Sequence, residues 1–283
     1  MKRIIVLFFC LSVFSCEDVI EVDVPSEDPR LVVDALIRID TSEAVTLVSI
    51  KVSQTNSFFG SVPPANLQQI TMTNLDFPEF SDGEPLEEEE PGTGIYSKFY
   101  PTEQLIAGRW FLQIDFEDEF YVATAEFQPS VPFDSIAQGD DTLFDEDDTE
   151  IILSYTDFPD REDYYLFDFN FENYFASEDT FYEGQSFSFS YFYDEDVNPG
   201  DELTISIMGI DEDFYNYMNL LIEQSNQDPS PFESPSVTVR GNIINATDID
   251  NMDSSNNVNN SDNFALGYFA IAEEYKASII IEE

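Results

Sequence analysis

Hydrophobic and polar residues alternate with a period of two along most of the chain. Clear examples are the runs 31–37, 45–52, 110–116 and 121–127, which are rich in β-branched and aromatic residues and are separated by polar segments. Such alternation places every second side chain on the same face of a strand, so that one face is buried and the other is solvated. The pattern predicts an N-terminal β-sandwich over residues 30–130, of the immunoglobulin-like or transthyretin-like kind.

Aromatic residues dominate the alternation in the second half of the chain. Two segments alternate strictly, one through Tyr165, Phe167, Phe169 and Phe171 and the other through Phe187, Phe189, Tyr191 and Tyr193. We expect both to be half-buried strands with one aromatic face, and to share a sheet. Pro129 and Pro132 mark a boundary before them. Residues 131–283 are therefore predicted to form a second, C-terminal β-rich domain.

One segment has a helical periodicity. Asp211 is a favourable N-cap, and acidic residues follow it in the first turn. Apolar residues then recur on one helical face, at Phe214, Met218, Leu221 and Ile222. The pattern predicts one helix near residues 211–225. The expected fold class is thus mainly β, with two β-sandwich-like domains, the second of which carries one packed α-helix.

The N-terminus has the features of an export signal. Lys2 and Arg3 precede an apolar stretch that is too short to span a bilayer, and a small residue and Cys16 follow it directly. This order predicts a lipoprotein signal peptide over residues 1–15, with Cys16 as the acylated first residue of the mature protein. Residues 16–29 are acidic and contain prolines, which is typical of an extended tether. The alternatives are a plain secretory signal or a membrane anchor with a coincidental cysteine.

Negative charge is the most extreme property of the sequence. The chain has 59 acidic and 10 basic residues; removal of Lys2 and Arg3 with the signal peptide would leave 8 basic residues, so the mature charge would be 8 − 59 = −51. Nucleic acid and anionic lipid surfaces repel such a body, and we expect neither as a partner. The charge either solvates an extracellular surface or associates with cations, and we favour solvation.

The sequence lacks histidine and has few cysteines, the residue types on which much enzyme chemistry depends. The chain has no histidine, and its two cysteines are Cys10, within the predicted signal peptide, and Cys16. This excludes a Ser-His-Asp triad, a Cys-His pair and histidine-ligated metal. A glycosidase-like pair of carboxylates needs no histidine, but acidic residues are so numerous that no pair stands out. We therefore expect no catalytic residues and no enzymatic activity.

The best cation candidate is the turn 194–202. Its oxygen-bearing side chains fall close to alternate positions, at Asp194, Asp196, Asn198 and Asp201. Hard cations such as Ca²⁺ favour ligands spaced in this way. The segment departs from an EF-hand, because Pro199 stands in the place of the glycine. A solvated hairpin turn is the favoured alternative, and apart from this possible calcium we expect no cofactor.

The aromatic alternation has two interpretations. Flat rings on a solvated face can bind sugars, but the chain has 27 Phe and 14 Tyr against 1 Trp, and phenylalanine has no polar edge for a wet ligand. We interpret these rings as core. An exposed strip along Tyr164, Tyr191 and Tyr193 would instead favour a sugar-binding surface.

Several segments carry a family resemblance, in order along nearly the whole mature chain. They are 16–20, 29–35, 107–112, 123–125, 131–136, 163–165 and 265–269. Together they resemble a family of Bacteroidota outer-membrane lipoproteins that is catalogued only as a domain of unknown function. Glu17 and Asp18 are similar to the acidic signal that sends such lipoproteins to the outer face of the outer membrane.

The resemblance implies a function through its context. Members are often encoded beside TonB-dependent receptors, so we expect a non-catalytic, surface-exposed outer-membrane lipoprotein that binds a ligand or partner in TonB-dependent nutrient uptake. Its partners would be the outer membrane, through the lipid anchor, and a TonB-dependent receptor. The main alternative is a structural or adhesive cell-envelope lipoprotein stabilised by calcium. No ligand-binding residues are predicted.

Overall fold

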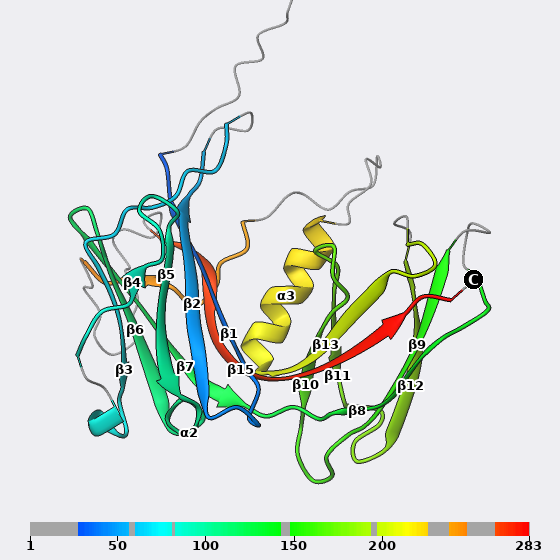
Figure 1. Ribbon diagram of the computed structural model, residues 1–283. Coiled ribbons are helices and arrows are strands. Elements are labelled where there is room, and N and C mark those ends of the chain that lie inside the picture. Colours follow the sequence, from blue (N-terminus) through cyan, green and yellow to red (C-terminus); the bar gives the residue numbers. More distant parts are fainter. Residues whose placement is uncertain are drawn as a thin grey trace, which may run out of the picture.

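The computed structural model describes residues 28–56, 60–80, 83–142, 148–193, 197–225, 238–247 and 264–282 (Figure 1). The strands of the first half are β1 (Leu31–Ile39), β2 (Val45–Gln54), β3 (Gln69–Asn74), β4 (Glu87–Glu88), β5 (Ile95–Pro101), β6 (Arg109–Phe116) and β7 (Glu119–Gln128). Those of the second half are β8 (Phe133–Gln138), β9 (Thr149–Thr156), β10 (Tyr164–Asp168), β11 (Tyr174–Glu178), β12 (Ser186–Tyr193), β13 (Glu202–Ile210), β14 (Ile244–Asn245) and β15 (Leu266–Ile280). The helical elements are η1 (Pro78–Phe80), α2 (Thr102–Leu105) and α3 (Glu212–Ser225).

The strands of the first half form a sheet that nearly closes on itself. Its order is β4-β5-β2-β1-β15-β7-β6-β3. Beside its two ends, the backbone N–H of Leu86 donates to the carbonyl oxygen of Ile70 at 2.9 Å. Inward positions alternate with outward ones, as in β2, where Ile50 and Val52 are fully buried. The inward side chains of all these strands fill one hydrophobic core.

The last strand, β15, joins the two halves. It pairs in parallel with β1 and briefly with β7, and then antiparallel with β13. Residues 268–274 are all buried, whereas residues 275–280 alternate between half-buried and exposed. A strand that is covered on both faces loses the period-two pattern, which explains the continuous apolar run at its start. The division near residue 130 into two domains stays a prediction, because β15 contributes to both halves.

The second half is built around a sandwich of aromatic side chains. The sheet β12-β9-β8 faces the strands β11, β10, β13 and β15. Phe169, next to β10, stacks on Tyr191 of β12 with ring centroids 3.7 Å apart, and Phe167 meets Phe189 edge to face at 5.2 Å. The prediction that these two segments share a sheet is therefore wrong. Alternation tells which face of a strand is buried, but it does not tell which strand is its hydrogen-bonded neighbour.

Helix α3 lies where the two halves meet, on the face of the β10-β11-β13 layer opposite the aromatic sandwich (Figure 1). Its N-cap is Asp211, whose Oδ1 accepts a hydrogen bond from the N–H of Phe214 at 2.7 Å. The ring of Phe214 is buried and lies 4.6 Å from that of Tyr268 on β15. The helix predicted near residues 211–225 is confirmed. The mainly β fold with one packed helix is confirmed with it.

Gly267 is a position where the backbone requires glycine. Its φ is +97°, and a Cβ there would lie 1.9 Å from the carbonyl oxygen of Val33 on the neighbouring strand β1. The backbone of Gly241 lies against the same place on β15: a Cβ at Gly241 would lie 1.7 Å from the carbonyl oxygen of Gly267. Only residues without a side chain allow the segment 238–247 to cross the start of β15 at this distance.

Within the part of the chain that the structure describes, no helix is both long and apolar enough to cross a membrane.

Candidate functional site

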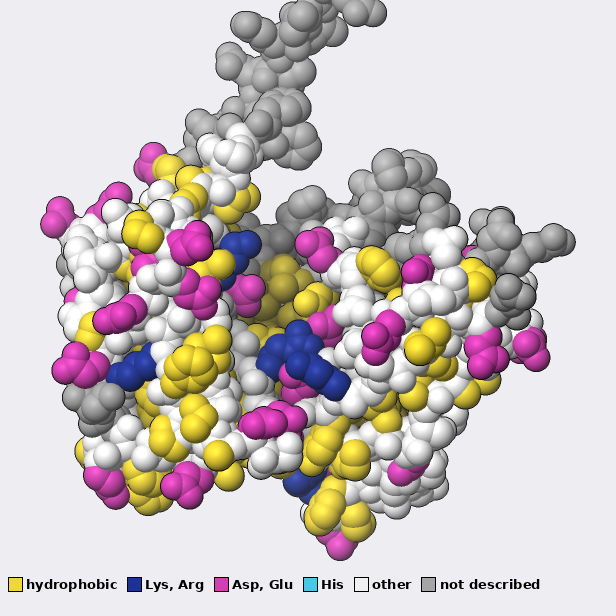
Figure 2. Space-filling view, in the orientation of Figure 1, with side chains coloured by type: hydrophobic (Ala, Val, Ile, Leu, Met, Phe, Trp, Pro, Cys, Tyr) yellow, Lys and Arg dark blue, Asp and Glu magenta, His cyan; other side chains and the backbone are white. Residues whose placement is uncertain are grey.

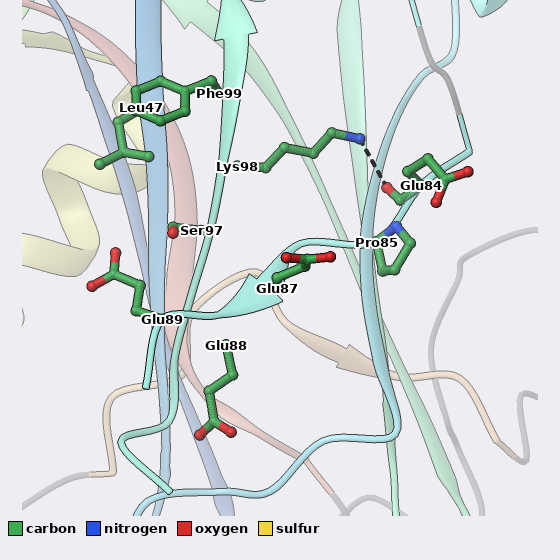
Figure 3. A pocket seen from close by; sticks show the side chains of 9 residues that line it. All are labelled: Leu47, Glu84, Pro85, Glu87, Glu88, Glu89, Ser97, Lys98 and Phe99. Carbon is green, nitrogen blue, oxygen red and sulfur yellow. Dashed lines mark hydrogen bonds between the residues drawn. The ribbon is translucent and has the colours of Figure 1, made fainter. Parts of the chain in front are cut away.

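A pocket lies on the outer face of the first half, where β2, β4 and β5 meet (Figure 3). The alternation of β2 turns Leu47 outward, and the antiparallel register places Phe99 of β5 opposite it. Leu47 is 46% exposed and Phe99 is 68% exposed. We call these two side chains the apolar wall. Figure 2 shows hydrophobic side chains over this part of the sheet, with acidic ones beside them.

Pro85 accounts for the opening of the sheet at this place. Strand β4 pairs with β5 over only two residues, and a continuation of its register would bring Pro85 opposite Phe99. Proline has no N–H to donate to the ladder, and the next residue, Leu86, donates to Ile70 of β3 instead. The ladder therefore ends, and a pocket of about 540 Å³ opens at the edge. We call it the edge pocket.

Glutamates surround the edge pocket. Glu84, Glu87 and Glu89 line it and are exposed, and we call these three the acidic rim. Glu88 also lines the pocket, but its carboxylate accepts hydrogen bonds from two backbone N–H groups of the following turn, at 3.0 and 2.9 Å. Glu88 therefore fixes the β4–β5 turn, while the acidic rim faces solvent.

Lys98 is the one cation among the lining residues of the edge pocket. Its ammonium group donates to the carbonyl oxygen of Glu84 at 3.1 Å and lies 5.4 Å from the centroid of the Tyr100 ring. Four glutamates against this lysine give a formal charge of 1 − 4 = −3 for the lining. The pocket thus combines an apolar wall with a net negative charge.

A second cluster of carboxylates is buried at one end of the aromatic sandwich. Asp157 follows β9, Asp163 precedes β10 and Asp179 follows β11, and their oxygens lie within 4.8 Å of one another. The hydroxyl of Tyr165 donates to Asp157 at 2.5 Å and is 3.2 Å from an oxygen of Asp163. Backbone N–H groups complete the set, because Gly184 donates to Asp157 and Asp163 donates to Asp179. We call these three residues the acid cluster.

The acid cluster contains its own positive charge. The Nε of Arg161 donates to Asp163 at 2.5 Å. Burial raises the pKa of Asp163 above its ordinary value even though Arg161 opposes the shift, and burial likewise raises the pKa of Asp179. A divalent cation bound by all three carboxylates would compete with Arg161 for Asp163. The arrangement therefore supports packing and hydrogen bonding at the end of the sandwich.

A third charged group lies at the joint between the halves. Arg38 of β1 donates to Asp168 and Glu274, both at 2.8 Å, and to the hydroxyl of Ser206 at 3.0 Å. Lys276 also contacts Glu274, at 3.0 Å. Burial alone would raise the pKa of Glu274, but the hydrogen bonds from Arg38 and Ser206 and the Arg38 charge lower it below its ordinary value. Figure 2 shows basic side chains gathered at the centre of this face, beside the hollow between the halves.

The residues singled out from the sequence lie in several places. Cys16, Asp194 and Asp196 fall outside the described residues. Asn198 and Asp201 belong to the turn before β13, where the N–H of Asn198 donates to the Asp201 carboxylate at 2.9 Å. The N–H of Asp201 also donates to the carbonyl oxygen of Asn198 at 3.0 Å, so the segment is a tight turn. It does not connect a hairpin, because β12 pairs with β9 while β13 pairs with β10 and β15, and the hairpin alternative is therefore wrong. The calcium site stays a prediction.

The tyrosines that would have indicated a sugar-binding strip do not form one. Tyr193 is fully buried, Tyr191 stacks on Phe169, and Tyr164 packs against Tyr215 of α3 at 5.1 Å between ring centroids. The interpretation of the aromatic alternation as core is confirmed for the residues of the aromatic sandwich. It is wrong for Phe171, which follows the end of β10 in a turn with positive φ and is 56% exposed.

Comparison with models of protein families matches one family over most of the chain. The model described as "Domain of unknown function (DUF4249)" matches residues 17–278, and the chain belongs to that family. A search of curated proteins found no match to the chain.

Sequence reasoning missed both the edge pocket and the acid cluster. The run 87–90 indicates an exposed acidic loop, but nothing in it shows that its first two residues form a strand beside Tyr96 and Ser97 of β5. Asp163 lies in a segment that carries the family resemblance, yet Asp157 and Asp179 have no distinguishing neighbours in the sequence. Pro85 beside the glutamate run is the only local signal, because a proline there predicts that strand pairing ends.

Proposed function

We propose that the protein is a non-catalytic outer-membrane lipoprotein, exposed at the cell surface, which serves as an accessory binding component of a TonB-dependent nutrient uptake system. The edge pocket is the observation that carries the binding role. The edge pocket is open to solvent and lies on a sheet with a well-packed core. It also places apolar side chains next to charged ones, as recognition sites on rigid scaffolds do.

The predicted lipid anchor supports a role beside the membrane. With Cys16 acylated, the tether of residues 16–29 would extend by at most about 50 Å before β1 begins. This reach allows the folded body to contact a receptor in the same membrane. A single lipidated terminus also leaves every face of the body free to turn toward such a partner.

The acid cluster supports the non-catalytic part of the proposal. Its carboxylates are buried, and they are held by Tyr165, Arg161 and backbone N–H groups. A carboxylate pair that hydrolyses a glycosidic bond must reach the substrate from both sides of that bond. Carboxylates that are closed off in a protein interior do not meet this requirement.

Co-purification from outer membranes tests the proposal. We expect the tagged wild-type protein, extracted in mild detergent, to co-purify with a TonB-dependent receptor. The matched control is Cys16→Ala, which should lose both labelling by a fatty-acid analogue and recovery in the membrane fraction. Absence of any receptor from the wild-type preparation would remove the uptake role, and equal labelling of the control would remove the anchor.

A further inference from the structure

We propose that the edge pocket binds a cationic segment of a partner protein, in which basic residues flank an apolar one. This inference rests on the proposed binding function and adds to it the surface used and the chemistry of the partner segment. Three properties of the described residues support it: the exposure of the apolar wall, the charge of the acidic rim and the place where strand pairing along β5 ends.

Exposure of the apolar wall is the first step. Leu47 and Phe99 lie opposite each other on adjacent strands, and Val45, two residues before Leu47, is 52% exposed on the same face. Inward residues of the same strands are almost completely buried, as Tyr100 is at 4% exposure. Val45, Leu47 and Phe99 thus lie outside the core and side by side on one face of the sheet, and we call these three residues the apolar strip. A continuous apolar strip on an otherwise acidic surface is a feature of interaction sites.

Charge identifies the occupant. The acidic rim stands beside the apolar wall, and the lining carries a formal charge of 1 − 4 = −3. An anionic segment would meet like charges, whereas lysine or arginine side chains would lie against the carboxylates while an apolar neighbour covers Leu47 and Phe99. A second copy of the chain is disfavoured, because its net charge of −49 would bring two acidic surfaces together.

Shape favours a protein segment over a small molecule. The pocket opens along the edge of β5 beyond the end of β4, and the apolar strip continues from it along β2. Small-molecule sites usually enclose most of the ligand surface. An extended segment can instead lie along the strip and place alternate side chains in the pocket. Figure 3 shows the two parts of the site, with Leu47 and Phe99 together at the upper left, three glutamates around the short strand β4, and Glu84 beside Pro85 at the right.

The test is a titration of the full-length protein in mild detergent with a short fluorescent peptide in which lysine and leucine alternate. We expect saturable binding that weakens with added salt, because exposed charges are screened. The same peptide with serine in place of leucine should bind at least about tenfold more weakly, a difference of about 1.4 kcal/mol. A peptide with glutamate in place of lysine should not bind.

Two pairs of variants locate the binding. Leu47→Ser with Phe99→Ser should weaken binding of the lysine-leucine peptide at least about tenfold, and Glu87→Gln with Glu89→Gln should weaken it several-fold and reduce its salt dependence. The matched controls change exposed residues elsewhere, namely Phe181→Ser with Leu220→Ser and Glu183→Gln with Glu202→Gln. Both controls should stay within about twofold of wild type.

Four outcomes would overturn the inference, three in the binding measurements and one in the co-purification. The first is equal binding of the leucine and serine peptides, and the second is equal loss in the control variants, which would mean attraction to overall charge alone. The third is self-association of the wild type that Phe99→Ser abolishes, because the occupant would then be a second copy. Co-purification of a receptor with the Leu47→Ser, Phe99→Ser variant as well as with wild type would leave the uptake role intact and reject the pocket. If the peptide binds as expected but no receptor co-purifies with wild type, the pocket stands and the uptake role is rejected.

Discussion

The acid cluster and the edge pocket combine the same two ingredients, carboxylates and apolar or aromatic side chains, with opposite results. In the acid cluster, Tyr165 and Arg161 donate to buried aspartates, and every carboxylate has a donor within the protein. In the edge pocket, the acidic rim and the apolar wall both face water. The difference teaches that composition does not locate a binding surface in a chain this acidic. Apolar and acidic side chains that are exposed together among the described residues locate it.

The largest expected effect is in the buried region, at the aromatic sandwich beside the acid cluster. Phe167 is fully buried, and its ring contacts those of Tyr155 at 5.6 Å and Phe189 at 5.2 Å. Phe167→Ala should lower the free energy of unfolding by about 3–5 kcal/mol, because it leaves a cavity in the aromatic sandwich. Chemical denaturation measures this change. Phe181→Ala, at a ring that is 89% exposed, is the control and should shift it by less than about 0.5 kcal/mol.

The next largest effect is expected where β1, β13 and β15 meet, because the buried carboxylate of Glu274 has the cationic partner Arg38 there. Arg38→Ala should destabilise the fold by about 2 kcal/mol, because Glu274 keeps its burial but loses its main donor. Since Arg38 and Ser206 lower the pKa of Glu274, its stabilising contribution is present above the unfolded-state pKa and is lost as the pH falls through the folded-state pKa. The loss caused by Arg38→Ala should therefore shrink in acid, and denaturation midpoints across pH would show it. A loss that is constant with pH would contradict this account.

The acid cluster should behave in the opposite way. Burial raises the pKa of Asp179, so the folded state binds a proton more readily than the unfolded state and gains stability as the pH falls through the folded-state value. Asp179→Asn keeps an oxygen that can accept from the N–H of Asp163 and removes a buried charge. It should stabilise the protein by about 1 kcal/mol at neutral pH and by less in acid. Asp118→Asn, at an exposed turn, is the control, and a destabilising effect of Asp179→Asn would show that the negative charge is needed.

The smallest expected effect on stability is at the exposed apolar wall of the edge pocket. Leu47→Ser with Phe99→Ser should change the free energy of unfolding by less than about 0.5 kcal/mol for each residue, because Leu47 is 46% and Phe99 68% exposed and neither belongs to the buried core. Thermal or chemical denaturation beside Phe167→Ala gives the contrast directly. A loss comparable with that of Phe167→Ala would mean that the apolar wall belongs to the core and is not held for a partner.

Much of the fold could be predicted from the sequence, because local patterns determine it. The alternation around Ile50 predicts its strand, and Asp211 with the apolar positions after it predicts α3 and its first turn. Strand neighbours could not be predicted in this way. Phe169 and Tyr191 were expected in one sheet and instead face each other across the sandwich. Which strands pair depends on loop paths and long-range packing, which period-two patterns do not contain.

The candidate site was much less predictable than the fold. Phe99 looks like any inward aromatic residue in the sequence, and only the register with Leu47 shows that both point outward. Among so many acidic residues, Glu87 and Glu89 differ from the others only by their neighbours in space. A site made by the end of a strand ladder, as at Pro85, becomes visible when the pairing is known.

Hydrogen–deuterium exchange of the full-length protein, with and without the lysine-leucine peptide, shows directly whether the peptide binds at the edge pocket. We expect slower exchange in residues 45–51, 84–89 and 95–101, which form the edge pocket and the apolar strip, and no change in residues 149–193 around the acid cluster. The protection should disappear in the Leu47→Ser, Phe99→Ser variant, while the exchange of its core strands stays as in wild type. Protection that is spread over all acidic surfaces, or centred on the second half, would contradict the account.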